Sequence, residues 1–435
     1  MGRPEPNSKA RFAATAPAKE GGSVPLWKMA FVGLAVATAW RLSLPKRRSS
    51  SATSMRYRAN TAWNAFQALN RLDDQEVQTF LNSFQLWDAP AFSTAADFHA
   101  GEPAAELVNK PADAQAVQDY YGVLNKLCAL GNVEKMYIPP VMDGQLGVFA
   151  NQLAYEEWFA GELQIHNESR VLELGCGRGR ISHHVASRTG ASVVAMNLEA
   201  TQLDAARAFA AETAMLDKLE FLRADFNHVL PFADESFDAA YEVQALTRRK
   251  AYSTNLTAVL GEVSRVLKVG GTLSLLDGVM LDGFDGTNET QKRLLHETRQ
   301  VTGLGGFWHY KYWHHALEES GFKILHARVE GGPQRAARVR WGENLARTAG
   351  ENPEHTAEGA PRPSDATHGW YPLIDRERWL FEHAVPVVDA LVRFKVLKPH
   401  FKTLLDRFTK HGDSFTAMDR EGLLTTSYAV IAQKL

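Results

Sequence analysis

The sequence has little cysteine, little net charge and no long uncharged apolar run. Its 435 residues include only two cysteines, Cys128 and Cys176, too few for a disulfide framework or a cysteine-based zinc site. The net charge of −2 provides no basic surface, so we expect no nucleic-acid partner. Among the 15 histidines, His183-His184 and His314-His315 are adjacent pairs, which point to different faces of a helix. The sequence therefore predicts no metal site.

The first 60 residues differ in composition from the rest. Residues 1–23 are rich in Ala, Ser and Pro and would not bury a core. The uncharged run Met29 to Trp40 is shorter than the ~20 residues that a membrane span needs, although snorkelling of flanking Lys and Arg would extend it to about 24–44. The basic run at 46–48 then predicts a membrane anchor, with the catalytic part facing the cytosol at the endoplasmic reticulum. The alternative is an organelle presequence, because the segment is rich in Arg, Ala and Ser and poor in acids.

The most informative pattern is the decapeptide at 171–180. An apolar run containing Glu173 leads into three alternating glycines, Gly175, Gly177 and Gly179, and a helix-like stretch follows. A strand, a glycine loop and a helix let the backbone approach a nucleotide-like ligand closely. A dinucleotide fingerprint would need glycine at 180, where Arg stands. A carboxylate two residues before the first glycine is instead typical of S-adenosylmethionine sites, where Glu173 would hold the methionine ammonium group.

Strand-like and helix-like stretches alternate after this loop. The stretch at 191–196 predicts a second strand ending at Asn197, whose side chain would meet the ribose hydroxyls, with Glu199 as its rival. The next strand ends at Asp225 and Phe226, which we expect at the adenine. Ligands bind where such parallel strands end. The pattern predicts an α/β fold: a Rossmann-like, seven-stranded, mostly parallel sheet with helices on both faces and a helical insertion near the C-terminus.

These residues resemble the sterol side-chain (C-24) methyltransferases from about residue 120 to the C-terminus. The resemblance rests on the glycine loop, on Asn197 and Gln202, and on segments 265–271 and 369–372. It implies methylation of carbon in a sterol or other lipophilic isoprenoid, with S-adenosylmethionine as cofactor and Gln202 among its binding residues. Two departures lie where the substrate would bind. Segment 128–140 replaces an aromatic-rich segment of the family, and Gln244 stands where an acid is usual.

The cofactor determines the chemistry that we expect. An alkene nucleophile needs no base before attack, aromatic faces can stabilise the resulting cation, and a base then removes a proton. Trp308, Tyr310 and Trp313 are the predicted substrate wall, Glu242 and His309 the candidate bases, and Tyr137 a further candidate catalytic residue that lines the site. Two alternatives remain: an O- or N-methyltransferase acting on another small molecule or a lipid headgroup, and a non-catalytic cofactor-binding scaffold.

The predicted organisation has five parts. Residues 1–60 form the N-terminal segment with the anchor or presequence, 61–118 a helical connector or lid, and 119–330 the methyltransferase core. Residues 331–422 are an insertion that caps the substrate, and 423–435 contain the final strand of the core. The expected partners are a small lipophilic substrate and a membrane, and the patterns give no oligomeric state.

Overall fold

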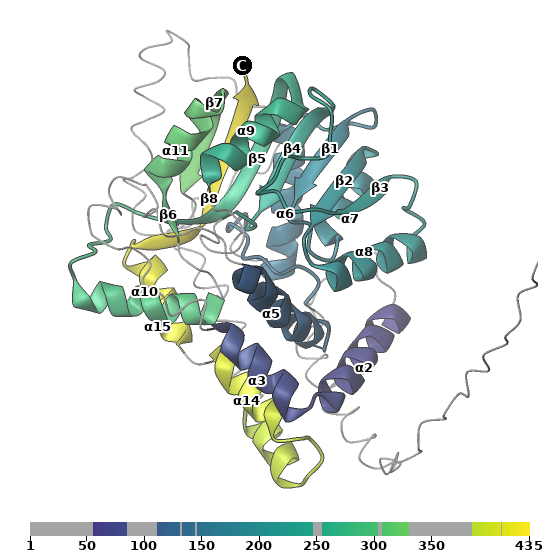
Figure 1. The fold of residues 1–435 in the computed structure, drawn as a ribbon, viewed down its shortest axis with the longest axis vertical. Coiled ribbons are helices and arrows are strands. Elements are labelled where there is room, and N and C mark those ends of the chain that lie inside the picture. Colours follow the sequence, from purple (N-terminus) through teal and green to yellow (C-terminus); the bar gives the residue numbers. More distant parts are fainter. Residues whose placement is uncertain are drawn as a thin grey trace, which may run out of the picture. The chain divides into compact units, whose positions relative to one another are not determined.

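The computed structural model describes eight stretches of the chain: 55–84, 111–130, 133–143, 146–246, 255–302, 307–329, 385–409 and 411–435 (Figure 1). The predicted anchor or presequence at 24–44 and most of the predicted insertion lie outside the described residues. Among the helices that the structure describes, none combines the length and apolar character that a membrane crossing requires.

A central sheet carries the fold. The strands are β1 (Arg170–Leu174), β2 (Ser192–Asn197), β3 (Leu219–Arg223), β4 (Phe237–Val243), β5 (Leu267–Met280), β6 (Trp308–His309), β7 (Phe322–Val329) and β8 (Leu424–Lys434). Their order is β3-β2-β1-β4-β5-β8-β7, and β6 pairs with β5. Strands β1 to β5 are parallel, and β8 runs antiparallel between β5 and β7. The mostly parallel fold and the antiparallel final strand are confirmed. The prediction of seven strands was wrong by one, because the two-residue strand β6 joins the sheet.

Helices cover both faces of this sheet (Figure 1). On one face lie α6 (Val148–Glu162), α7 (Arg180–Thr189) and α8 (Ala200–Glu212), whose apolar residues share a core with alternate residues of β1 and β2. On the other face lie α9 (Leu256–Val266) and α11 (Tyr310–Glu319). The Asn255 side chain caps α9 by accepting a 3.0 Å hydrogen bond from the Ala258 amide. The buried apolar positions of α9 recur at helical spacing, which directs one face to the sheet.

Helices from the two ends of the described chain pack together. The N-terminal members are α2 (Met55–Arg71), α3 (Asp74–Ser83) and α5 (Pro111–Leu130), and the C-terminal members are a helix over 385–393 and α14 (His400–Thr409). Their shared core includes Leu69, Phe80, Tyr120 and Phe401, and the His400 Nε2 lies 2.9 Å from the Leu69 carbonyl oxygen. Described parts of the predicted connector and insertion therefore form one helical layer, although the predicted domain boundaries stay predictions.

A smaller core joins the remaining helices to the sheet. Helices α10 (Glu289–Thr302) and α15 (Gly412–Arg420) pack around the ends of β5 and β8, and Phe307, Phe415 and Met418 are buried between them. This region lies beyond the carboxyl end of β5, on the side of the sheet where α/β folds bind their ligands.

Candidate functional site

The glycine loop between β1 and α7 has the backbone shape that the sequence predicts. Gly175, Gly177 and Gly179 have φ values of +73°, +52° and +66°, all in the left-handed region. A Cβ atom at Gly175 would lie 2.5 Å from the Ala245 Cβ, and one at Gly179 would lie 2.7 Å from the Phe221 ring. At Gly177 a Cβ would meet no atom within 4 Å. Gly177 therefore borders open space, whereas the other two glycines are required by the packing of the protein itself.

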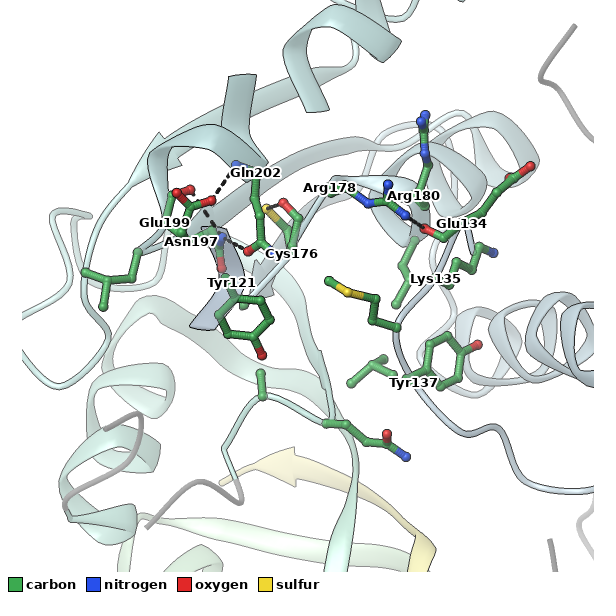
Figure 2. Close-up of a pocket in the computed structure, with 18 of the residues that line it drawn as sticks. Tyr121, Glu134, Lys135, Tyr137, Cys176, Arg178, Arg180, Asn197, Glu199 and Gln202 are labelled. Atoms are coloured by element: carbon green, nitrogen blue, oxygen red, sulfur yellow. Dashed lines mark hydrogen bonds between the residues drawn. The ribbon is translucent and has the colours of Figure 1, made fainter. Parts of the chain in front are cut away.

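This open space is a cleft that is partly open to solvent (Figure 2). It lies over the carboxyl ends of β1, β2 and β4, and α5 and the segment before α6 form its other walls. The predicted site residues Gly175, Gly177, Asn197, Gln202, Phe226 and Tyr137 line it, and so does Glu199, the predicted rival of Asn197. Sequence reasoning missed Gln118, Tyr121, Lys135, Arg178 and Arg180, which also line it.

Asn197 and its neighbours form one wall of the cleft. Asn197 Nδ2 donates a 2.7 Å hydrogen bond to Gln202 Oε1, and the two residues lie side by side in Figure 2. The Glu199 carboxylate caps α8 instead, accepting hydrogen bonds from the amides of Thr201 at 3.0 Å and Gln202 at 2.7 Å. Glu199 is thus engaged as a helix cap, which favours Asn197 over Glu199 for contact with a ribose.

The residues predicted at the adenine have different placements. Phe226 is buried and lines the cleft, whereas Asp225 is not among the lining residues. The Asp225 Oδ1 accepts hydrogen bonds from the Asn227 amide at 2.9 Å and from Asn227 Nδ2 at 2.8 Å. The carboxylate therefore stabilises the turn that places Phe226.

Glu173 lies on β1, two residues before the first glycine of the loop, and is not among the residues that line the cleft. The side chain is buried, and its Oε2 has no hydrogen-bond partner among the described residues. Burial raises the pKa of Glu173 to about 7, an effect that the nearby hydroxyls of Ser182 and Tyr241 oppose. A buried carboxyl oxygen without a partner is costly, so this position fits a site that a polar ligand group or a water completes.

Opposite Asn197, the segment 133–143 runs along the cleft without regular structure. Side chains from three directions bind its backbone: Arg178 donates to the carbonyls of residues 133 and 134, and Asn151 accepts from the amides of 142 and 143. Gln244 binds both backbone groups of Ile138, accepting at 3.1 Å and donating at 2.8 Å, and also donates to the Thr426 carbonyl at 2.9 Å. Gln244, the position where an acid was expected, therefore fixes the wall of the cleft.

Helix α6 anchors the same segment through a buried charged cluster. Glu156 is buried and accepts a hydrogen bond from the Tyr137 hydroxyl at 2.7 Å; it also pairs with Lys135 and lies 2.7 Å from His184 Nδ1. Burial opposes ionisation of Glu156, but Lys135 and His184 outweigh it and hold the pKa of this carboxyl below its usual value. Gln152 and Glu156 stand at helical spacing in the sequence, and both reach the segment 135–137.

The two predicted bases lie away from the cleft lining. Glu242 is fully buried at the end of β4, where its Oε2 accepts a 2.9 Å hydrogen bond from the Ala245 amide. Burial, together with the nearby Asp277, raises the pKa of Glu242 well above its ordinary value. His309 accepts from the Lys311 amide at the start of α11, and its Nε2 lies 3.2 Å from Asp282 Oδ1. Both groups support neighbouring turns, and neither lies among the cleft residues.

The predicted aromatic substrate wall is placed differently from the expectation. Trp308 and Trp313 are each 1% exposed and belong to the hydrophobic core under α9 and α11. Tyr310 is half-buried, and its hydroxyl donates a 2.7 Å hydrogen bond to Asp282. None of the three lines the cleft. The aromatic cluster follows from the packing of a helix against the sheet, which an amphipathic aromatic stretch also predicts.

Comparison with known proteins defines the class. Residues 171–271 match a family model described as a methyltransferase domain. With the doubly wound sheet and the glycine loop, this match identifies a class I S-adenosylmethionine-dependent methyltransferase that uses S-adenosylmethionine as its cofactor.

The chain is also similar to particular enzymes of this class. It is 25% identical to a sterol 24-C-methyltransferase of Gibberella zeae over 322 residues, which are 74% of this chain and 79% of that protein. It is 27% identical to the sterol 24-C-methyltransferase of Saccharomyces cerevisiae over 212 residues, and this match spans about half of each chain, 48% and 54%. The crystal structure of the [4+2]-cyclase SpnF aligns with a TM-score of 0.50 and 18% identity, covering 75% of this chain and 97% of that one. This last likeness concerns the fold alone.

Proposed function

We propose that the chain transfers a methyl group from S-adenosylmethionine to carbon in the side chain of a sterol or a related lipophilic isoprenoid. The observation that carries the proposal is the alignment with 79% of the Gibberella zeae sterol 24-C-methyltransferase, which extends well beyond the matched methyltransferase domain. The cleft agrees with a lipophilic acceptor, because Tyr121, Met136, Val243 and Ala245 give it apolar walls next to the glycine loop.

The residues of the cleft fit the cofactor. When bound, S-adenosylmethionine supplies an electrophilic methyl group on its sulfonium centre. Gly177 leaves backbone exposed to the cleft, and Phe226 offers an aromatic face for the adenine. We propose that Asn197 accepts a hydrogen bond from a ribose hydroxyl and that Asp225 contacts the adenine amino group. We also propose that the unpaired oxygen of Glu173 accepts a hydrogen bond from the methionine ammonium group.

Tyr137 would shape the acceptor side of the reaction. Its hydroxyl points to α6, donating to Glu156 and lying 3.0 Å from the Gln152 carbonyl oxygen, so the ring borders the cleft. Glu156 raises the pKa of the buried Tyr137 hydroxyl further, so this group keeps its proton. A neutral ring that is held in place can stabilise a cation forming in the substrate, and its apolar surface helps to exclude water. Glu242 and His309 stay predicted bases that lie outside the cleft.

We also propose that the enzyme acts at a membrane surface, with the endoplasmic reticulum as the expected location. A lipophilic acceptor must come from a membrane, and the sequence at 24–44 has apolar character with basic flanks. The alternative reading of this segment as an organelle presequence makes a different prediction, namely a shortened mature chain in an organelle.

The proposal is tested by following the label. The full chain would be incubated with methyl-labelled cofactor and, in parallel, with a sterol carrying a side-chain double bond and the same sterol with a saturated side chain. We expect label only in the neutral lipid fraction of the unsaturated reaction, and mass spectrometry should place the new methyl group on carbon. Label in a polar headgroup or on oxygen or nitrogen would support the O- or N-methyltransferase alternative. Cofactor binding without labelling of a total lipid extract would support the non-catalytic scaffold.

A further inference from the structure

We propose that Gln202 and Asn125 are positioning residues that orient the Asn197 amide, so that Asn197 Oδ1 faces the ribose hydroxyls of the cofactor. This inference rests on the proposed contact between Asn197 and the ribose. Where such a site has a carboxylate, either oxygen can accept from a ribose hydroxyl. An amide has one acceptor and one donor group, so an Asn at this position works as an acceptor only if something decides which way it points.

The three amides form a chain of hydrogen bonds. Asn197 Nδ2 donates to Gln202 Oε1 at 2.7 Å, and Gln202 Nε2 donates to Asn125 Oδ1 at 2.9 Å. Asn125 lies on α5, 77 positions before Gln202 in the sequence. The chain thus connects the end of β2 and the first turn of α8 to the helical layer that forms another wall of the cleft.

A backbone carbonyl favours one donor-to-acceptor direction for these hydrogen bonds. Three amides alone could all turn over and donate in the opposite direction. Asn197 Nδ2 also lies 3.5 Å from the Glu199 carbonyl oxygen and donates to it. If the Asn197 amide were reversed, its Oδ1 would face that carbonyl oxygen and repel it. The Glu199 carbonyl therefore supports Gln202 Oε1, the nearer acceptor, in holding Nδ2 on the inner side, and Oδ1 is directed away from both.

Asn125, the last of the three hydrogen-bonded amides, is left with a donor group that no described residue pairs. Asn125 Nδ2 is buried and has no hydrogen-bond partner among the described residues. The reverse direction would leave an acceptor there instead. The role of Asn125 is to hold Gln202. Its Oδ1 accepts from Gln202 Nε2 and so keeps the Gln202 amide in the orientation that presents Oε1 to Asn197.

Two opposite substitutions at one position test the idea. Gln202→Glu places only acceptors between the two asparagines, so Asn197 Nδ2 still points inward and Oδ1 still faces the cleft. Gln202→Lys places only donors there, so Asn197 Nδ2 loses its nearer acceptor and faces a cation; we expect the amide to turn and present Nδ2 to the cleft. The readout is the ratio of the dissociation constants of 2′,3′-dideoxy-S-adenosylhomocysteine and S-adenosylhomocysteine, measured by calorimetry on the full chain. A charge effect changes both affinities alike, whereas the ratio reports on the hydroxyls.

We expect the wild type and Gln202→Glu to prefer the ligand with the diol by about tenfold, the worth of one well-made hydrogen bond. Gln202→Lys should bind the two ligands about equally. Asn125→Leu should reduce the preference because it frees the Gln202 amide, and Asn125→Asp should keep it because an acceptor remains.

Several outcomes would overturn the inference. One is an undiminished diol preference in Gln202→Lys, and another is equal losses in Asn125→Leu and Asn125→Asp. Since the Asn125 variants change a half-buried helix position, they provide the test even if Gln202→Lys does not fold. A wild type without diol preference would also overturn the inference. It would leave the methyl-transfer proposal intact, because the binding assay contains no sterol substrate. A normal preference in an enzyme that labels no sterol would contradict only the proposed function.

Discussion

Replacing Gly177 by Ala should separate cofactor binding from folding. Its φ of +52° is unfavourable for any residue with a Cβ, which costs about 1–2 kcal/mol of folding stability. No protein atom lies within 4 Å of the new methyl group, so no packing penalty is added. The methyl group instead occupies the cleft, where overpacking by about 1–3 kcal/mol would weaken S-adenosylhomocysteine binding roughly 5- to 150-fold.

Gly179→Ala is the matched control. It has the same kind of φ, but its Cβ would lie 2.7 Å from the Phe221 ring and 2.8 Å from the Ala206 Cβ. Overpacking then adds about 1–3 kcal/mol to the cost in folding stability. Urea unfolding should show Gly179→Ala to be the less stable variant. Calorimetry should show that Gly177→Ala loses more affinity for S-adenosylhomocysteine than its smaller loss of folding stability would account for. Normal affinity in a folded Gly177→Ala protein would refute the assignment of the loop.

Three further predictions follow from the site. Burial raises the pKa of Glu173 from 4.5 to about 7, so its contribution to stability is full below about pH 4.5 and is lost as the pH rises towards 7, at up to ~1.4 kcal/mol per pH unit. Glu173→Gln should flatten the pH dependence of the unfolding free energy, measured by urea titration of the ligand-free protein. An unchanged pH dependence would contradict the raised pKa of Glu173. Asn197→Ala should weaken S-adenosylhomocysteine binding by ~1–3 kcal/mol, whereas Glu199→Ala should mainly lose the helix cap, at about 0.5–2 kcal/mol of folding stability; the reverse pattern in calorimetry would assign the ribose to Glu199. Trp308→Leu should lower the unfolding free energy by roughly 2–4 kcal/mol, and slower methyl transfer at unchanged stability would restore Trp308 to the substrate wall.

The sequence predicted the backbone of the glycine loop and part of the cleft lining because local geometry governs both. Alternating glycines after a buried strand favour a left-handed backbone, because glycine adopts it without steric cost, and all three have it. The ends of parallel strands meet at one edge, so Asn197 and Phe226 could be placed near the loop from strand order alone, and both line the cleft. Asp225 stands at the end of a neighbouring strand, and only the structure shows that its carboxylate also binds the Asn227 amide of its own turn, so its contact with the adenine stays a prediction.

The acceptor side could not be read in the same way, because its residues come from segments that are distant in the sequence. Gln244 joins Ile138 to Thr426, and Glu156 joins Lys135 and Tyr137 to His184. No periodicity or motif relates such positions. The aromatic stretch at 307–313 could not be assigned from the sequence, because a substrate wall and a core helix have the same composition and differ in burial.

The sequence by itself determined the order of strands and helices, the glycine loop and the class of cofactor. These depend on interactions between neighbouring residues: backbone conformations that only glycine adopts readily, and apolar spacing that commits each element to one face. The tertiary structure alone decided which polar groups meet. It placed Asn125 against Gln202, the C-terminal helix over 385–393 and α14 against α2 and α3, and Tyr137 at the cleft with its hydroxyl turned away. The physical reason is that a hydrogen bond between distant segments depends on how whole elements pack, and that packing is a property of the complete core.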